Sequence, residues 1–187
     1  MRRDILFALE RLLQNKTYVE IGVNEICAEG HISKPTFYRY FRSKDNIVQW
    51  MFHEALNCGV AHIGRKYNWL EGYYRTTQVF FRHRALYSDP LSPALINSLI
   101  AYCSDYLKGA FVDTIVECKG VQLTEKLIFQ IEALNYAQGH ISRQWGANGM
   151  SIPPETVAEY FRSIVPYDLF ILLNEPSEAS TKPEAKS

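Results

Sequence analysis

The sequence lacks the features that mark membrane and secreted proteins. No run approaches the roughly 18 apolar residues that a membrane span needs. The basic, amphipathic start MRRDILFALERLL has neither the continuous apolar core nor the small-residue cleavage site of a signal peptide. We therefore expect a cytoplasmic protein with no membrane partner.

Signatures of catalysis and of metal binding are also missing. The chain has no GxSxG, HExxH or GxGxxG motif and no phosphate-binding glycine-rich loop. Its cysteines are widely spaced and form no CxxC pair, so we interpret them as small core hydrophobes in a reducing compartment: Cys27, Cys58, Cys103 and Cys118. A metal site built from these cysteines and the histidines is the weaker alternative. We expect no enzyme activity and no cofactor.

Net charge is absent, because 20 Lys and Arg residues balance 20 Asp and Glu residues. Affinity for a nucleic acid must then come from local clustering of charge and not from a global field. The clearest cluster runs from His31 to Lys44, where basic and aromatic side chains gather with no acid between Glu29 and Asp45.

Strand signals are weak throughout, and apolar residues recur at helical spacing, which predicts an all-α fold. We expect a first helix at the amino terminus, short helices at 23–29 and after Ser33, and a longer one from Lys44 to about Arg65. Further helices are expected at 69–87, 92–118, 124–146 and 154–173. We divide the chain into a module at 1–46, a larger domain at 47–174 and a disordered tail at 175–187.

The helix after Ser33 has two faces of different chemistry. Ser33 is placed to cap it, Pro35 fits its first turn, and Phe37 and Phe41 share one face. The opposite face then carries Lys34, Pro35, Tyr38 and Arg39, with Thr36 on one flank. Two short helices around a glycine-containing turn, the second basic, outline a helix-turn-helix. A merely solvated helix is the alternative, but it leaves Tyr38 and the missing acids unexplained.

The stretch VNEICAEGHISKPTFYRYFRSKDNI resembles the TetR family of bacterial transcriptional regulators (TetR/AcrR type). The family's pattern is met by Ile26, Ile32, Ser33, Thr36, Phe37, Tyr38, Tyr40, Phe41, Ser43, Lys44 and Asp45, within about the first 50 residues. The resemblance implies that the DNA-binding residues are Ser33, Lys34, Pro35, Thr36, Tyr38 and Arg39 at bases or adjacent phosphates, with Tyr40 and Lys44 clamping the backbone. Gly30-His31 departs from the usual Ala-Gly, so the left-handed position of the turn is either shifted or taken by His31. Gly22 replaces a common phosphate-binding hydroxyl.

The resemblance also implies a helical ligand-binding and dimerisation domain in which the last two long segments pair with their copies. The apolar residues of 124–146 and 154–173 permit this pairing, and the alternative is that they face the monomer's own core. A pocket for an apolar or aromatic effector is expected among Trp69, Tyr73, Phe80, Tyr102, Tyr106, Phe129 and Tyr136. Aromatic residues at helical spacing also build ordinary cores, so both interpretations of these residues stay open.

The leading hypothesis is a homodimeric regulator, by family usage a repressor, that binds a palindromic DNA operator and is released by a small-molecule effector. Coupling is expected to run through the fourth helix. A second hypothesis is a protein-binding co-regulator that keeps the fold without specific DNA binding, because Asp45 to Trp50 is similar to a branch of the family that includes such a co-activator. The sequence leaves the effector, the operator, the regulated genes and the sign of regulation open.

Overall fold

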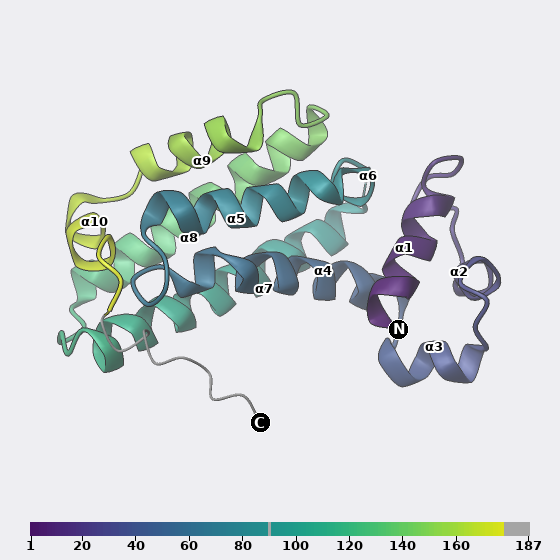
Figure 1. Cartoon of the computed structure of the whole chain (residues 1–187), viewed down its shortest axis with the longest axis horizontal. Helices are drawn as coiled ribbons and strands as arrows, with labels where there is room; N and C mark the ends of the chain where they lie inside the picture. Colours follow the sequence, from purple (N-terminus) through teal and green to yellow (C-terminus); the bar gives the residue numbers. More distant parts are fainter. Residues whose placement is uncertain (90, 178–187) are drawn as a thin grey trace.

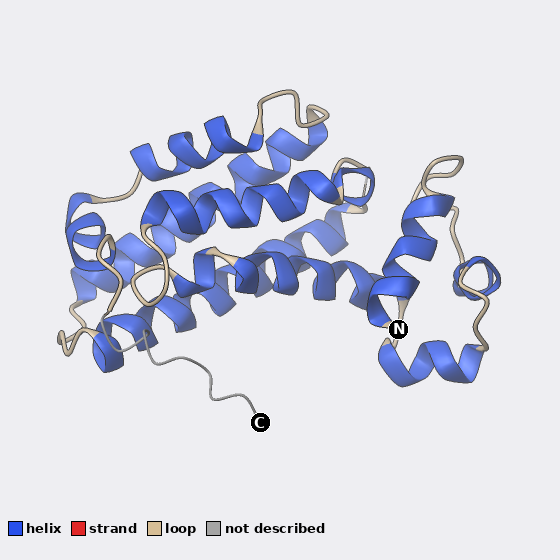
Figure 2. Cartoon of the chain, in the orientation of Figure 1, coloured by secondary structure: helices blue, strands red, loops and turns tan. Residues whose placement is uncertain are grey.

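The computed structural model describes residues 1–89 and 91–177, and all the regular structure in these ranges is helical (Figure 2). The all-α prediction is therefore confirmed. The elements in chain order are α1 (Arg2–Leu12), α2 (Val23–Glu29), α3 (Lys34–Tyr40), α4 (Lys44–Cys58), η1 (Val60–His62), α5 (Trp69–Arg82), α6 (Arg84–Tyr87), α7 (Pro93–Asp113), η2 (Thr114–Cys118), α8 (Glu125–Ala147), α9 (Pro154–Ser163) and α10 (Tyr167–Leu173).

The helices form two groups of unequal size. Helices α1 to α3 make a small module at one end of the molecule, and α4 runs from it into a larger bundle of helices (Figure 1). In the bundle α5 packs against α9 and α4, and α7 packs against α8. No helix in the described ranges is long and apolar enough to cross a membrane. The exact division of the chain at residue 46 stays a prediction, since α4 passes through that point without a break.

Helix α4 ends at Cys58, several residues before the expected end near Arg65. The chain turns at Gly59, which has φ −144° and ψ −83°. A side chain there would place its Cβ 2.2 Å from the carbonyl oxygen of Gly72 on α5. Glycine at this position therefore lets α4 stop and cross closely over α5.

Two expected long helices are each divided. His83, with φ −99° and ψ 29°, separates α5 from α6, and Pro166, which has no backbone N–H, precedes α10 and separates it from α9. Residues 175–177 were assigned to a disordered tail, but the backbone N–H of Ser177 donates to the carbonyl of Gly64 at 3.0 Å. The remainder of that prediction, 178–187, lies outside the described residues.

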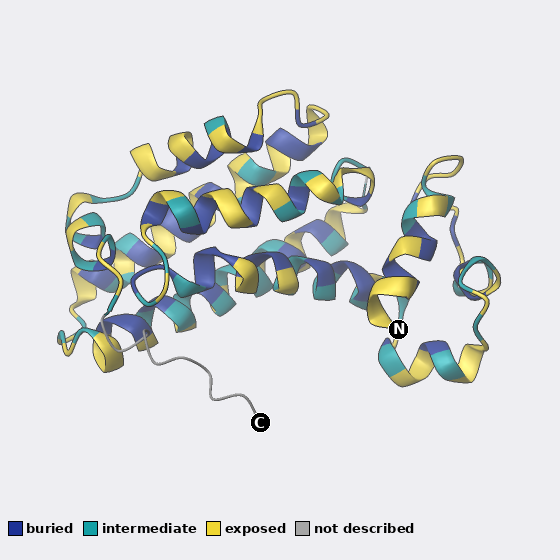
Figure 3. Ribbon diagram, in the orientation of Figure 1, coloured by how far each residue is buried: buried dark blue, intermediate teal, exposed yellow. Residues whose placement is uncertain are grey.

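Buried side chains run through both groups of helices and form one continuous core (Figure 3). Trp69 is fully buried in the bundle, with its ring 5.7 Å from Tyr73 and 5.5 Å from Phe111 between centroids. In the module the equally inaccessible side chains are Ile5, Leu9, Ile26 and Phe37, and Ile47 of α4 adjoins them. Burying each such side chain stabilises the fold by about 1.5–3 kcal/mol. Cys58 and Cys118 are exposed, so the expectation that all four cysteines lie in the core is wrong for these two.

Candidate nucleic-acid interface

The turn between α2 and α3 is closed by His31. His31 has φ 51°, whereas the preceding Gly30 has φ −84°, so the histidine and not the glycine occupies the left-handed position. The N–H of Ile32 donates to the carbonyl of Cys27 at 2.9 Å, which closes the end of α2. The second of the two alternatives drawn from Gly30-His31 is thus the observed one.

Ser33 fixes the start of α3. Its hydroxyl oxygen accepts a hydrogen bond from the N–H of Thr36 at 3.2 Å and lies 2.9 Å from the Thr36 hydroxyl. Pro35 lies in the first turn, where its missing N–H costs nothing. Because α3 has only seven residues, these local bonds set its direction.

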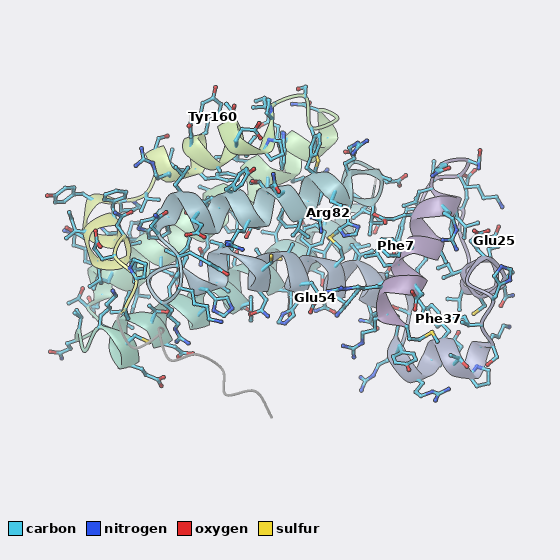
Figure 4. The ribbon with its side chains drawn as sticks, viewed as in Figure 1. Phe7, Glu25, Phe37, Glu54, Arg82 and Tyr160 are labelled. Atoms are coloured by element: carbon cyan, nitrogen blue, oxygen red, sulfur yellow. The ribbon has the colours of Figure 1, made fainter. Side chains whose placement is uncertain are left out.

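Phe37 anchors α3 to the rest of the module. Its side chain is fully buried, and Figure 4 shows it on the side of α3 that faces α1. The ring packs against Phe41, and Phe41 in turn packs against Trp50 on α4. Tyr38, one residue along, projects from the opposite face with 53% of its surface exposed.

The structure brings most of the predicted DNA-contacting residues to one surface. Ser33, Lys34, Pro35, Tyr38 and Arg39 are exposed, and Thr36 and Tyr40 are half-buried beside them. We call the surface formed by Lys34, Pro35, Tyr38 and Arg39 the outer face of α3. A short helix that offers guanidinium, ammonium and phenol groups in this way suits a nucleic-acid groove.

No acid neutralises this outer face. Within the described ranges, Lys34, Arg39 and Arg42 make no ion pair. The nearby acids of α2 are already engaged, since Glu25 binds Lys16 and Glu29 binds Arg11. The hydrogen bond from Lys16, helped by the N–H of Gly22, lowers the pKa of Glu25. The cations of α3 therefore stay available for a polyanion.

Lys44 is an exception among these residues. It was expected to be an exposed clamp for the DNA backbone, but its side chain is only half-exposed and turns toward the loop before α2. Its ammonium donates to the carbonyls of Tyr18 at 2.7 Å and Ile21 at 2.8 Å, with Val19 at 3.3 Å. Three N–H groups meet three carbonyls, so none is left for a phosphate in this conformation.

Tyr18 is a central residue that the sequence analysis missed. Its hydroxyl donates to Asp45 Oδ1 at 2.5 Å, and its backbone N–H donates to Asp89 Oδ1 at 3.0 Å. Burial, together with the hydrogen bond to Asp45, raises the pKa of Tyr18 well above its usual value. No motif marks Tyr18, because its partners lie 27 and 71 residues away in the chain.

A second contact joins the module to the bundle near the start of α6. His83 Nδ1 lies 2.9 Å from Glu10 Oε1, and both side chains are largely buried. The ring of Phe7 stacks on His83 with centroids 6.2 Å apart, and Figure 4 shows Phe7 and Arg82 at this junction. The module is thus held by α4, by Asp89 and by His83, whereas the sequence analysis considered α4 alone.

The bundle contains two adjoining cavities. The outer cavity, of about 90 Å³, lies among α4, α5, α7 and α8 and is bounded by Phe52, Leu56, Phe80, Tyr87, Asp89, Leu91, Ile96, Leu99, Ile100, Cys103, Gly139, Ser142 and Arg143. The inner cavity, of about 50 Å³, is bounded by Leu56, Val60, Tyr73, Thr76, Thr77, Phe80, Leu107, Gln138, Ser142 and Phe161. Leu56, Phe80 and Ser142 border both cavities, so the two form one interrupted space.

The aromatic residues predicted to line a pocket lie in different parts of the structure. Tyr73 borders the inner cavity and Phe80 borders both, while Trp69 belongs to the solid core. Tyr102 and Tyr106 lie on α7 beside α4, where their hydroxyls bond His53 and Asn57, and they border neither cavity. Nothing in the sequence marked Gln138 or Ser142 as cavity residues, because α8 carries many polar side chains and their spacing does not show which of them face α5.

Phe129 and Tyr136 lie on the surface, with 71% and 61% of their areas exposed, and border neither cavity. The buried residues of α8 include Leu127, Ile131, Leu134 and Gln138, which places Phe129 and Tyr136 on the opposite side of the helix. We call Phe129 and Tyr136 the outer face of α8. Helices α9 and α10 expose further large apolar side chains: Tyr160, Ile164, Tyr167 and Ile171.

A capped basic helix after a tight turn, carried on a larger helical bundle, defines a helix-turn-helix transcriptional regulator. In the described ranges no group of His, Cys, Asp or Glu side chains is arranged to hold a metal ion. Residues 5–51 match the family model described as bacterial regulatory proteins of the tetR family. Residues 67–167, more than half of the chain, match the model described as the transcriptional regulator C-terminal region. The chain belongs to the TetR family of bacterial transcriptional regulators.

Known proteins similar to this chain agree with that membership. It is 43% identical over 44 residues to the HTH-type transcriptional regulator EthR of Mycolicibacterium smegmatis, a match over 24% of this chain and 20% of that protein. It is 25% identical over 87 residues to DhaS of Lactococcus lactis, a dhaKLM operon transcriptional activator, over 43% of this chain and 46% of that protein. These matches thus span a fifth and under half of the relatives' own lengths.

Two solved structures share the fold. One is that of the dihydroxyacetone kinase operon activator DhaS, with a TM-score of 0.65 and 17% identity over 91% of this chain and 96% of that one. The other is a tetR-family transcriptional regulator from Streptomyces coelicolor, with a TM-score of 0.56 and 16% identity over 96% of this chain and 95% of that one.

Proposed function

We propose that the protein is a homodimeric regulator whose two α3 helices bind the half-sites of a palindromic DNA operator, and that a small-molecule effector releases it. The observation that carries this proposal is the outer face of α3, where Lys34 and Arg39 are exposed without an acid to neutralise them. Exposed cations beside Tyr38 and Thr36 offer contacts to phosphates and to base edges. Family membership supports the same function.

The homodimer is proposed from the outer face of α8 and the apolar residues of α9 and α10. Large apolar side chains that gather on the surface of a monomer are typical of an interface. Figure 4 shows Tyr160 on the side of α9 that points away from α5. Two copies joined through these helices would present two α3 helices, and duplication of the reading helix increases affinity for a palindrome.

Coupling between effector and DNA is proposed to use the contact of Asp89 with Tyr18. Asp89 borders the outer cavity and also accepts the N–H of Tyr18, whose hydroxyl binds Asp45 at the start of α4. A ligand that moves this edge of the cavity would therefore pull on the loop that Lys44 holds. In Asp89→Ala we expect faster hydrogen exchange at the Tyr18 amide and an operator affinity changed by about fivefold or more. Unchanged affinity would exclude this route.

The test of the main proposal is to select bound sequences from a random DNA pool with the full chain. Recovery of an inverted repeat supports a dimer that reads two half-sites, and its affinity should fall steeply with salt because phosphate contacts release counterions. Failure to enrich any sequence would refute operator binding. Fusing the selected site to a reporter then decides between repression and activation, a choice kept open because the relative DhaS is named an activator.

A second candidate function is that of a protein-binding co-regulator. The observation in its favour is that Lys44 is engaged by carbonyls, which leaves the module with fewer free phosphate donors than the family resemblance implied. This function predicts no salt-dependent DNA binding but capture of a protein partner through the outer face of α3. Lys34→Ala with Arg39→Ala would then weaken the protein complex.

A further inference from the structure

We propose that the effector is an uncharged small molecule with an apolar or aromatic body and one hydrogen-bonding group, and that Tyr73 and Gln138 bind this group in the inner cavity. The inference rests on the proposed function, because it names the kind of effector that the regulator senses. It follows from three properties of the two cavities: an incompletely used polar pair, the absence of charge around it, and the apolar lining next to it.

The polar pair comes from facing helices. Gln138 on α8 donates from Nε2 to the hydroxyl of Tyr73 on α5 at 2.5 Å, and both side chains are more than nine-tenths buried. This bond uses one donor and one acceptor of the pair. The amide still holds a second N–H and its oxygen, and the phenol still holds its own O–H. Exchanging the amide's oxygen and nitrogen would again leave both a donor and an acceptor free.

The two threonine hydroxyls at the inner cavity are already satisfied. Thr76 accepts from the N–H of Val60 at 3.0 Å and donates to the carbonyl of Ala55 at 3.2 Å. Thr77 donates to the carbonyl of Pro154 at 3.0 Å. Among the described residues of this cavity, Tyr73 and Gln138 therefore keep strong unused hydrogen-bonding capacity deep in the bundle, and the hydroxyl of Ser142 adds to it at the border with the outer cavity. This set suits a ligand hydroxyl, carbonyl or amide.

Among the residues that the structure describes, no Asp, Glu, Lys, Arg or His lines the inner cavity. A carboxylate or ammonium bound there would lose its hydration without gaining a counter-charge, and that loss is far more costly than the loss for a neutral group. The charged residues of the combined space, Asp89 and Arg143, border the outer cavity only. The inner cavity thus selects against ionised ligands.

The outer cavity provides the place for the apolar body. Phe52, Phe80 and Tyr87 lie close together there, with ring centroids 4.4 to 5.2 Å apart. Leu56 and Phe80 connect this ring cluster to the inner cavity. An apolar cavity of roughly 150 Å³ admits benzene, and the two cavities together approach this size. A single ring with a one-carbon side group is therefore a fitting probe.

The experiment compares four ligands of matched size on the full chain without DNA: toluene, benzyl alcohol, benzoate and benzylammonium, each titrated by calorimetry at neutral pH. We expect benzyl alcohol to bind at least about tenfold more tightly than either ion, because only the ions must be desolvated as charges. Benzoate binding as tightly as benzyl alcohol, or no binding by benzyl alcohol, would overturn the inference. Loss of benzoate binding in Arg143→Gln would then place an anion at the outer cavity instead.

Tyr73→Phe identifies the group that binds the hydroxyl. We expect it to weaken benzyl alcohol binding about three- to tenfold, the usual effect of one hydrogen bond, and to leave toluene binding unchanged. Tyr74→Phe is the matched control, since Tyr74 lies next in the chain but borders neither cavity. If Tyr73→Phe does not fold, Gln138→Leu makes the same test. An equal loss for toluene and benzyl alcohol would mean that Tyr73 only shapes the cavity, and would refute the assignment.

A titration with DNA present tests this inference separately from the proposed function. Repeating the titration with the selected operator present shows whether the ligand weakens DNA binding by the same factor by which DNA weakens ligand binding. Benzyl alcohol that binds with the expected preference but leaves operator affinity unchanged would support the inference and refute release by an effector.

Discussion

The outer faces of α3 and α8 are both exposed, but their chemistry is opposite. On α3, Lys34 and Arg39 stand in water without a neutralising acid. On α8, Phe129 and Tyr136 expose most of their ring surface. A hydrated cation is well solvated in water, and binding a polyanion is favourable because counterions are released. Exposed rings are poorly solvated, so their burial against any apolar surface is favourable.

This difference suits each of the two surfaces to a different kind of partner. A neutral net charge conceals it, because the acids that balance α3 lie elsewhere in the chain. It also determines how each surface responds to conditions: contacts of α3 with DNA should weaken with salt, and contacts of α8 with a second copy should not.

The largest expected effect comes from placing charge on the outer face of α8. In Phe129→Glu with Tyr136→Glu, dimerisation would bury carboxylates without partners, at about 3–5 kcal/mol each, and twofold symmetry repeats the cost. We expect a folded monomer by analytical ultracentrifugation. Val19→Glu, a change at an equally exposed apolar residue of the module, should remain dimeric. A wild-type protein that sediments as a monomer would contradict the assignment.

A smaller effect is expected from removing cations on the outer face of α3. Arg39→Ala should cost about 1–3 kcal/mol of operator binding per half-site if it contacts a base, and should relax sequence preference at that position. Lys34→Ala should weaken binding to all sequences alike and reduce the salt slope by about one. Fluorescence anisotropy across a salt series separates the two. Lys66→Ala, an exposed cation of the bundle, is the control and should bind as wild type.

The variant Lys44→Met tests whether the DNA-binding surface extends beyond α3 to the start of α4. Because the Lys44 ammonium is bound to the carbonyls of Tyr18 and Ile21, Lys44→Met should lower the free energy of unfolding by about 1.5–3 kcal/mol in urea titrations. The salt slope of DNA binding should change little at temperatures where the variant is folded. A stable Lys44→Met protein whose salt slope falls by one would restore the phosphate clamp that the sequence suggested.

The helix caps and Lys44 show which contacts of the module could be predicted from the sequence and which could not. Helix starts followed from local chemistry: Ser33 and Ser43 cap α3 and α4 as expected, because a capping oxygen and the N–H that donates to it lie three residues apart. The two faces of α3 also followed from spacing. The contacts of Lys44 could not be predicted, because its carbonyl partners lie 23 to 26 residues earlier in a loop without regular structure.

The residues expected to line an effector pocket were harder to place from the sequence, for a related reason. Ring content alone does not distinguish the core residue Trp69, the cavity residue Tyr73 and the surface residue Tyr136, since all three lie on helices with apolar neighbours. Their separation depends on which helices meet: α5 lies between α4 and α9, while one side of α8 stays uncovered in the monomer. Such packing across helices leaves no local pattern in the sequence.

The smallest expected effect concerns the hydrogen bond between Tyr18 and Asp45, beside the contact of the module with the bundle, and it appears only in alkaline solution. Burial and the bond to Asp45 raise the pKa of Tyr18, so the folded protein keeps this proton when the unfolded chain, with a tyrosine pKa of about 10, loses it. Protons bound by the folded state alone make stability fall as pH rises, by up to about 1.4 kcal/mol per pH unit for one group. The stabilisation is therefore complete below about pH 9 and declines above about pH 10.

Tyr18→Phe removes the titrating group, while Tyr73 and Tyr87, whose pKa values burial also raises, remain in both proteins and cancel. In urea titrations between about pH 8 and pH 11, the stability advantage of the wild type over Tyr18→Phe should be constant at first and then shrink. A stability advantage that stays constant to about pH 11 would show that the Tyr18 hydroxyl titrates alike in the folded and unfolded chain. Its bond to Asp45 would then not help to hold the module against the bundle.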